Sequence, residues 1–162
     1  MIISFPLAFF IHDLEEILVQ HKWMSAHKEG LLRRFPKLQP MIRHLSSLNS
    51  KAFTIAVIEE SVLLLLATAY YLADGPYALE LWAALFVAFS VHLVVHIGQG
   101  IIIRGYVPGL ITSILLLPYS CYGISCICQE INSGKLILLG VIGFIAIAVN
   151  LWFAHWLGKK FK

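Results

Sequence analysis

The residues best suited to chemistry lie near the N-terminus, where the stretch from Ile11 to Ile17 places one imidazole and three carboxylates in an otherwise apolar segment. In a helix, His12, Glu15 and Glu16 occupy positions i, i+3 and i+4 and project from one face toward a common point. Asp13 lies about 100° around the helix from His12, at the rim of that face. An imidazole and carboxylates arranged in this way are typical of metal ligands or of a proton relay.

Two further pairs of such side chains occur in later apolar segments. Glu59 and Glu60 are adjacent, so their side chains point about 100° apart on a helix. His92 and His96, at i and i+4, share a face and can offer two nitrogens to one ion, which is the spacing of helical zinc sites. We expect Asn150, in the last apolar segment, and Asp13 to hydrogen-bond to ligands rather than to bind the ion.

The composition predicts the class of protein that holds these side chains in place. Of the 162 residues, 59% are hydrophobic and only 13% are charged, far from the values of soluble globular proteins. The sequence therefore predicts an all-α integral membrane protein with a single domain, residues 1–162. The net charge of +3 is too small to suggest nucleic acid, and membrane lipid is the expected partner.

Five apolar runs are long enough to cross a bilayer: 2–20, 52–73, 78–103, 107–128 and 136–157. The segment 22–50 differs from them, because it is rich in Lys and Arg and contains Pro36 and Pro40. Its apolar residues recur at steps of four and three, namely Leu31, Phe35, Leu38, Ile42 and Leu45. This spacing predicts one or two short amphipathic helices lying in the membrane interface.

The distribution of Lys and Arg predicts the orientation. With five alternating spans, eleven of the twelve basic residues fall on one side, and only Lys135 falls on the other. Basic residues accumulate on the cytoplasmic side of a membrane. We therefore expect the segment 22–50 and the C-terminus in the cytoplasm and the N-terminus outside.

The same topology places the candidate side chains at similar depths. At about 1.5 Å per residue from the basic edge of each span, most lie roughly 9 to 15 Å deep, and His92 lies about 18 Å deep. Those in the first group are His12, Glu16, Glu59, Glu60, His96 and Asn150. Several separate helices thus place side chains that can bind a metal at a similar depth, in the cytoplasmic half of the bilayer.

Carboxylates inside a bilayer need compensation, and four glutamates cost roughly 5 to 10 kcal/mol. Protonation is one route, and binding of one or two divalent cations is another. We favour a metal centre of zinc, iron or manganese whose ligands come from one set: His12, Glu15, Glu16, Glu59, Glu60, His92 and His96. The candidate catalytic residues are the four glutamates of that set, Glu15, Glu16, Glu59 and Glu60.

Two chemistries fit such a centre. A zinc-like ion held by His12, His92 and His96 with a carboxylate would lower the pKa of bound water, while a free glutamate acts as general base. Alternatively, the glutamates bridge two metal ions that activate oxygen. The sequence leaves both open, and in either case the expected substrate is lipid-soluble or delivered by the membrane.

Two other classes of protein would use the same residues. A proton-coupled or metal transporter needs an access route on the outer side, where the sequence offers almost no charge. A non-catalytic membrane subunit would turn the ionisable residues into a buried hydrogen-bond network. Both remain alternatives to a metal-dependent membrane enzyme.

The motif His12-x-x-Glu15-Glu16 on an N-terminal span, followed by His92-x-x-x-His96 on a later one, resembles the HXXEE-domain family of small bacterial membrane proteins. That resemblance covers essentially the whole chain, and it implies a helix bundle in the bacterial inner membrane with a polar core and no established reaction. A weaker similarity links Glu59-Glu60 and the later histidines to intramembrane proteases of the CaaX-processing type. The arginine expected shortly after such a Glu pair is missing here.

Overall fold

The computed structural model describes residues 1–160, and all regular structure in that range is helical. The elements are α1 (Ser4–Arg34), the short 3-10 helix η1 (Pro36–Leu38), α2 (Gln39–Ser46), α3 (Ser50–Leu72), α4 (Ala78–Ile103), α5 (Leu110–Glu130) and α6 (Ser133–Lys160). No strand occurs in these residues. The predicted all-α class is confirmed.

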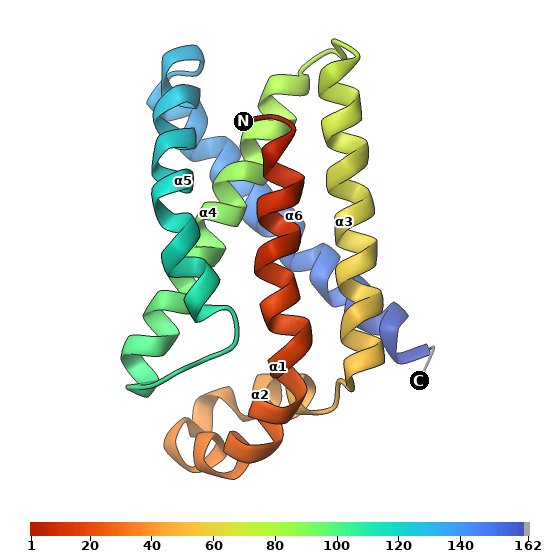
Figure 1. The fold of residues 1–162 in the computed structure, drawn as a ribbon, viewed down its shortest axis with the longest axis vertical. Coiled ribbons are helices and arrows are strands. Elements are labelled where there is room, and N and C mark those ends of the chain that lie inside the picture. Colours follow the sequence, from red (N-terminus) through yellow and green to blue (C-terminus); the bar gives the residue numbers. More distant parts are fainter. Residues whose placement is uncertain (161–162) are drawn as a thin grey trace.

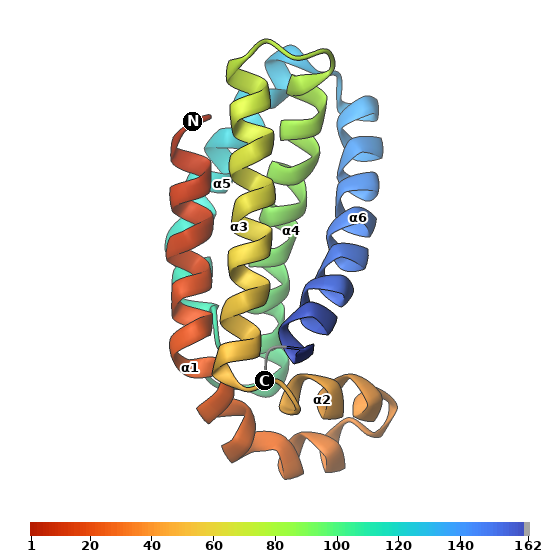
Figure 2. The same cartoon turned by 90° about the vertical axis from the view of Figure 1, so that its right-hand side faces the viewer.

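The long helices form a bundle around α4, which packs against α3, α5 and α6 (Figures 1 and 2). The first part of α1 lies along the bundle and packs against α3 and α5. On the other side of α4, glycines let α6 approach closely: a Cβ on Gly143 or Gly158 would collide with a backbone carbonyl of α4 or α3, respectively. The helix α4 is thus the one that contacts each of the other three apolar helices, α3, α5 and α6.

An aromatic cluster joins α1 to α4. Phe5 is buried and makes edge contacts with Trp82 and Phe86 of α4, with ring centroids 5.4 and 5.0 Å apart. Farther along α4, Phe89 also packs against Phe5 at 5.4 Å. Residues seven apart lie on the same helix face, so the face of α1 that carries Phe5 also carries His12, and both point toward α4.

Four of the described helices, α3 to α6, are long and apolar enough to cross a membrane. The chain therefore has the helices of a membrane protein, but four rather than the five predicted meet this criterion. The expected span at 2–20 does not meet this criterion, because Asp13, Glu15 and Glu16 interrupt its apolar sequence with three carboxylates. The other four agree with the predicted ranges to within a few residues.

The sequence prediction for residues 22–50 was only partly right. Residues 22–34 continue α1 as one helix, since nothing before Pro36 breaks it. The residue before a proline disfavours helical geometry, and Phe35 has φ −126° and ψ 67°. After η1, the chain forms the predicted short helix α2. Figure 2 shows the end of α1 and α2 lying across one end of the bundle.

The end of α1 is tied to the end of α4. The Arg34 guanidinium donates to the carbonyls of Ile102 and Ile103, at 2.6 and 3.1 Å. These carbonyls belong to the last turn of α4, where helices have no internal donors left, and a cation there also complements the helix dipole. This contact fixes the basic segment beneath α4.

A second contact ties α2 to α6. His44 Nε2 lies 3.2 Å from Nδ1 of the buried His155, and Lys159 Nζ lies 3.2 Å from His44 Nδ1. Burial and the neighbouring Lys159 charge lower the pKa of the His44 imidazole. The folded protein therefore favours neutral His44.

This contact should make the docking of α2 depend on pH. Above about pH 6.5, His44 is neutral in both the folded and the unfolded chain, so the contact is fully formed. As the pH falls below that value, the unfolded state takes up the proton first, and the contact weakens. Amide hydrogen exchange, corrected for intrinsic rates, should be faster in α2 at about pH 5.5 than at about pH 7.5. His44→Gln should reduce the difference, because only His155 of the imidazole pair then remains to titrate; equal exchange in the parent protein at both pH values would contradict the expectation.

Candidate metal centre

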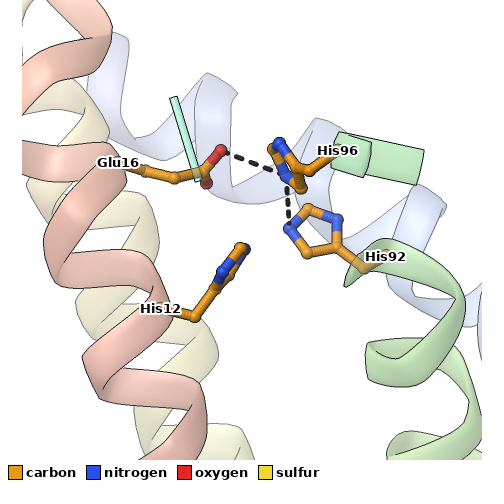
Figure 3. Close-up of side chains that lie close together, drawn as sticks. All are labelled: His12, Glu16, His92 and His96. Carbon is orange, nitrogen blue, oxygen red and sulfur yellow. Dashed lines mark hydrogen bonds and ion pairs between the residues drawn. The ribbon is translucent and has the colours of Figure 1, made fainter. Parts of the chain in front are cut away.

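Four of the predicted side chains meet between α1 and α4, and we call them the His/Glu cluster: His12, Glu16, His92 and His96. One ligand atom of each lies within 4.8 Å of all the others. The Nε2 atom of His96 is 3.2 Å from Glu16 Oε1 and 2.9 Å from His92 Nε2. Figure 3 shows the imidazoles of α4 converging on His12 and Glu16 from α1.

The cluster fits a divalent cation in size and in donor chemistry. Ligands about 2.0 to 2.1 Å from a tetrahedral ion lie roughly 3.3 Å from one another. The distances from His96 Nε2 to Glu16 and to His92, 3.2 and 2.9 Å, are close to this value, and all four ligand atoms lie within 4.8 Å of one another. Three imidazoles and one carboxylate form a donor set suited to zinc and similar ions. His12 is fully buried, and its Nε2 has no hydrogen-bond partner among the described residues. A buried nitrogen without a partner is costly, and a cation would satisfy it.

Helical register explains why these residues meet. His12 and Glu16 are four residues apart on α1, as His92 and His96 are on α4, so each pair lies on one face. The Phe89 ring packs against His12 at 5.8 Å, which continues the aromatic contact of Phe5 toward the cluster. The imidazole rings of His12 and His92 are 5.0 Å apart. The aromatic packing thus sets the depth at which the two polar faces meet.

Glu15 does not join the cluster but binds the beginning of α5. Its Oε2 accepts from the backbone N–H and the hydroxyl of Thr112, at 2.8 and 2.7 Å. Its Oε1 accepts from the Tyr106 hydroxyl at 2.8 Å and from the N–H of Ile111 at 3.3 Å. The N-cap residue of α5, Gly109, has no side chain, so Glu15 supplies the cap from another helix.

The loop between α4 and α5 closes over the cluster. Gly109 has a left-handed φ of 79°, and a Cβ there would lie 2.9 Å from His12 Cε1 and 3.1 Å from His96. The Thr112 hydroxyl lies 2.9 Å from His12 Nδ1. Burial and the hydrogen bond to Glu15 raise the pKa of Tyr106, which keeps its hydroxyl a donor.

Sequence reasoning missed these contributions of the loop and of α5. Pro108 and Gly109 mark a turn, but nothing in that turn signals an imidazole beside it. Thr112 is one of several hydroxyl residues in an apolar helix, and no spacing distinguishes it from the others.

The remaining predicted residues lie beside the cluster or apart from it. Asn150 Nδ2 donates to Glu59 Oε2 at 3.0 Å, so Asn150 serves a glutamate outside the cluster. Glu60 interacts electrostatically with Asp13 and Glu16, and its buried Oε1 has no partner within residues 1–160. Of the seven predicted ligands, the structure therefore groups four and leaves Glu15, Glu59 and Glu60 outside the group.

These observations define an all-helical protein with membrane-type helices and an internal His/Glu group able to hold a metal ion. The chain belongs to the family described as "Protein of unknown function with HXXEE motif", whose model matches residues 3–123. The resemblance inferred from the motif is thus confirmed, and all four cluster residues lie in the matched region. Comparisons with curated proteins and with solved structures give no match.

The first prediction for this site concerns Gly109. Gly109→Ala should destabilise the protein, because the left-handed backbone alone costs about 1 to 2 kcal/mol and the new methyl group meets both His12 and His96. Metal uptake should fall as well, since the imidazoles must move. Gly30→Ala is the matched control, because a Cβ on this α1 glycine meets nothing within 4 Å. Thermal unfolding and metal content of the two purified variants provide the measurement; equal values would count against the close approach.

The second prediction concerns the cap formed by Glu15. Glu15→Ala leaves the N–H groups of Ile111 and Thr112 without their acceptor and should cost on the order of 2 kcal/mol. The exposed Glu29 on the same helix is the control, and Glu29→Ala should be nearly neutral. Unfolding midpoints in detergent should separate the two variants by several degrees, and faster hydrogen exchange at the start of α5 should accompany the loss. An unchanged midpoint for Glu15→Ala would show that the cap contributes little.

Proposed function

We propose that this protein is an integral membrane metalloenzyme that holds one divalent cation in the His/Glu cluster and hydrolyses a lipid-soluble or membrane-delivered substrate. The observation that carries the proposal is the convergence of three imidazoles and one carboxylate within 4.8 Å, inside a bundle of membrane-type helices. Ionisable groups are expensive in such a setting and are usually functional.

The proposal includes α1 as a fifth span. This helix lies along the bundle beside α3 and α5 (Figure 1), and its polar face is turned inward: Asp13 is only 4% exposed and His12 is fully buried. Its outer face carries apolar residues such as Leu7, Leu14 and Leu18, which are exposed as lipid-facing residues would be. With five spans, the excess of Lys and Arg favours an outside N-terminus and a cytoplasmic C-terminus in the inner membrane of a bacterium.

The donor set favours a single ion over a pair bridged by glutamates. Among the described residues, the group able to hold a metal contains one carboxylate and three imidazoles. Glu15 is already engaged by four donors, and Glu59 is bonded by Asn150. A di-iron or di-manganese centre needs several bridging carboxylates. The hydrolytic alternative is therefore better supported than the oxidative one.

Each part of the site has a role in this proposal. A divalent ion bound there would lower the pKa of a bound water molecule to about 7. His12, His92, His96 and Glu16 would hold the ion, and the water molecule would need a further coordination position beside these four ligands. Within residues 1–160, the buried Glu60 Oε1 has no hydrogen-bond partner, and Glu60 interacts electrostatically with Glu16. We therefore assign it the general base that takes the water proton. The surrounding apolar helices limit the access of bulk water.

Metal analysis of the purified protein tests the proposal. We expect close to one zinc or similar ion per chain, and His12→Ala and His96→Ala should each remove most of it. His27→Ala is the control, because His27 is exposed and lies in the basic part of α1 away from the cluster. Two irons or manganese ions per chain would overturn the single-ion site in favour of oxidative chemistry. A metal-free protein that keeps its full stability would instead support a non-catalytic membrane subunit.

A further inference from the structure

We infer that Thr112 and Glu15 position His12 by fixing which imidazole nitrogen carries the proton, so that His12 Nε2 is left free as a ligand. The inference rests on the proposed function, which supplies the cation. Neither Thr112 nor Glu15 binds the ion in this arrangement, so both are positioning residues.

The hydrogen bonds at Glu15 determine where the Thr112 hydroxyl hydrogen lies. The Glu15 carboxylate is the acceptor in four hydrogen bonds, which are donated by two backbone N–H groups and by the hydroxyls of Tyr106 and Thr112. The shortest of them, at 2.7 Å, is the one from Thr112 Oγ1. A hydroxyl has a single hydrogen, and a bond to a carboxylate is stronger than one to a neutral acceptor. The Thr112 hydrogen is therefore committed to Glu15.

The Thr112 oxygen lies 2.9 Å from His12 Nδ1, and without a second hydrogen it can only accept there. His12 Nδ1 must then carry the proton and donate it. The same conclusion holds if the hydroxyl turns to its other acceptor, the Gly109 carbonyl at 3.3 Å. In a neutral imidazole the second nitrogen then has a free lone pair.

The free lone pair of His12 lies on Nε2. His12 Nε2 is the nitrogen that is buried without a partner in the described chain, and His12 belongs to the cluster that could hold an ion. The opposite tautomer would place a hydrogen there and bury the lone pair against Thr112. A group that hydrogen-bonds to the ring nitrogen not bound to the metal commonly sets the tautomer and orientation of a ligand histidine. Removing such a group typically lowers the metal affinity 10- to 100-fold.

The tautomer can be measured without any metal. In the full-length, metal-free protein with 15N-labelled histidine, NMR in detergent at neutral pH should show His12 protonated on Nδ1 and bare on Nε2. Thr112→Ser keeps the hydroxyl and should keep this pattern, whereas Thr112→Val should lose it. Thr68→Val is the matched control, because Thr68 is a buried helical threonine whose hydroxyl donates to the carbonyl of Leu64 in its own helix. A proton on Nε2 in the parent protein would overturn the inference, even if Thr112→Val does not fold.

Titration with Co²⁺ tests the consequence for binding. Thr112→Val should weaken Co²⁺ binding by about 10- to 100-fold, while Thr112→Ser and Thr68→Val should stay close to the parent protein. Equal affinity in Thr112→Val and Thr112→Ser would refute the positioning role although the metal site itself stands. If the parent protein binds no Co²⁺, the proposed function fails, and the NMR result still decides the tautomer on its own.

Discussion

Glu15 of α1 accepts hydrogen bonds from the first turn of α5, where the N-cap residue Gly109 has no side chain to do so. The four N–H groups at the start of a helix need acceptors, and water is scarce inside a membrane-type bundle. Glu15, a carboxylate from a neighbouring helix, satisfies two of them, the N–H groups of Ile111 and Thr112, and also complements the positive end of the helix dipole. This contact holds the α4–α5 loop against α1, which places Gly109 beside the imidazoles and Thr112 beside His12.

The His/Glu cluster depends equally on apolar packing. Phe5 and Phe89 bring α1 and α4 together one or two turns from the imidazoles. This contact joins apolar rings, which have no polar groups that water must solvate. The same burial removes water from His12, so its polar atoms must find partners within the protein or in a bound ion. The packing that buries the phenyl rings thus leaves both nitrogens of His12 in need of a polar partner. Thr112 is the partner of Nδ1, and we assign a cation as the partner of Nε2.

The two adjacent glutamates of the motif show how far sequence reasoning reaches. Helical spacing correctly predicted that His12 and Glu16 share a face of α1. The expectation that Glu15 points to the same place was wrong, because Glu15 and Glu16 point about 100° apart. Glu16 turns toward His96, and Glu15 turns toward α5. The choice between them depends on which helices flank α1, and no local pattern encodes that. The same holds for Glu59, whose partner Asn150 lies far along the chain on α6.

The sequence by itself determined the all-helical class, the apolar helices α3 to α6, the spacing of His92 and His96, and the family, because these follow from composition and from periodicity along one chain. Only the tertiary structure decided which four side chains share a site, that α1 continues unbroken to Arg34, and that Thr112 and Gly109 contact the imidazoles. Contacts of this kind depend on distances between helices that are remote in sequence. Packing sets those distances to within a fraction of an ångström, a precision that residue types and spacing cannot supply.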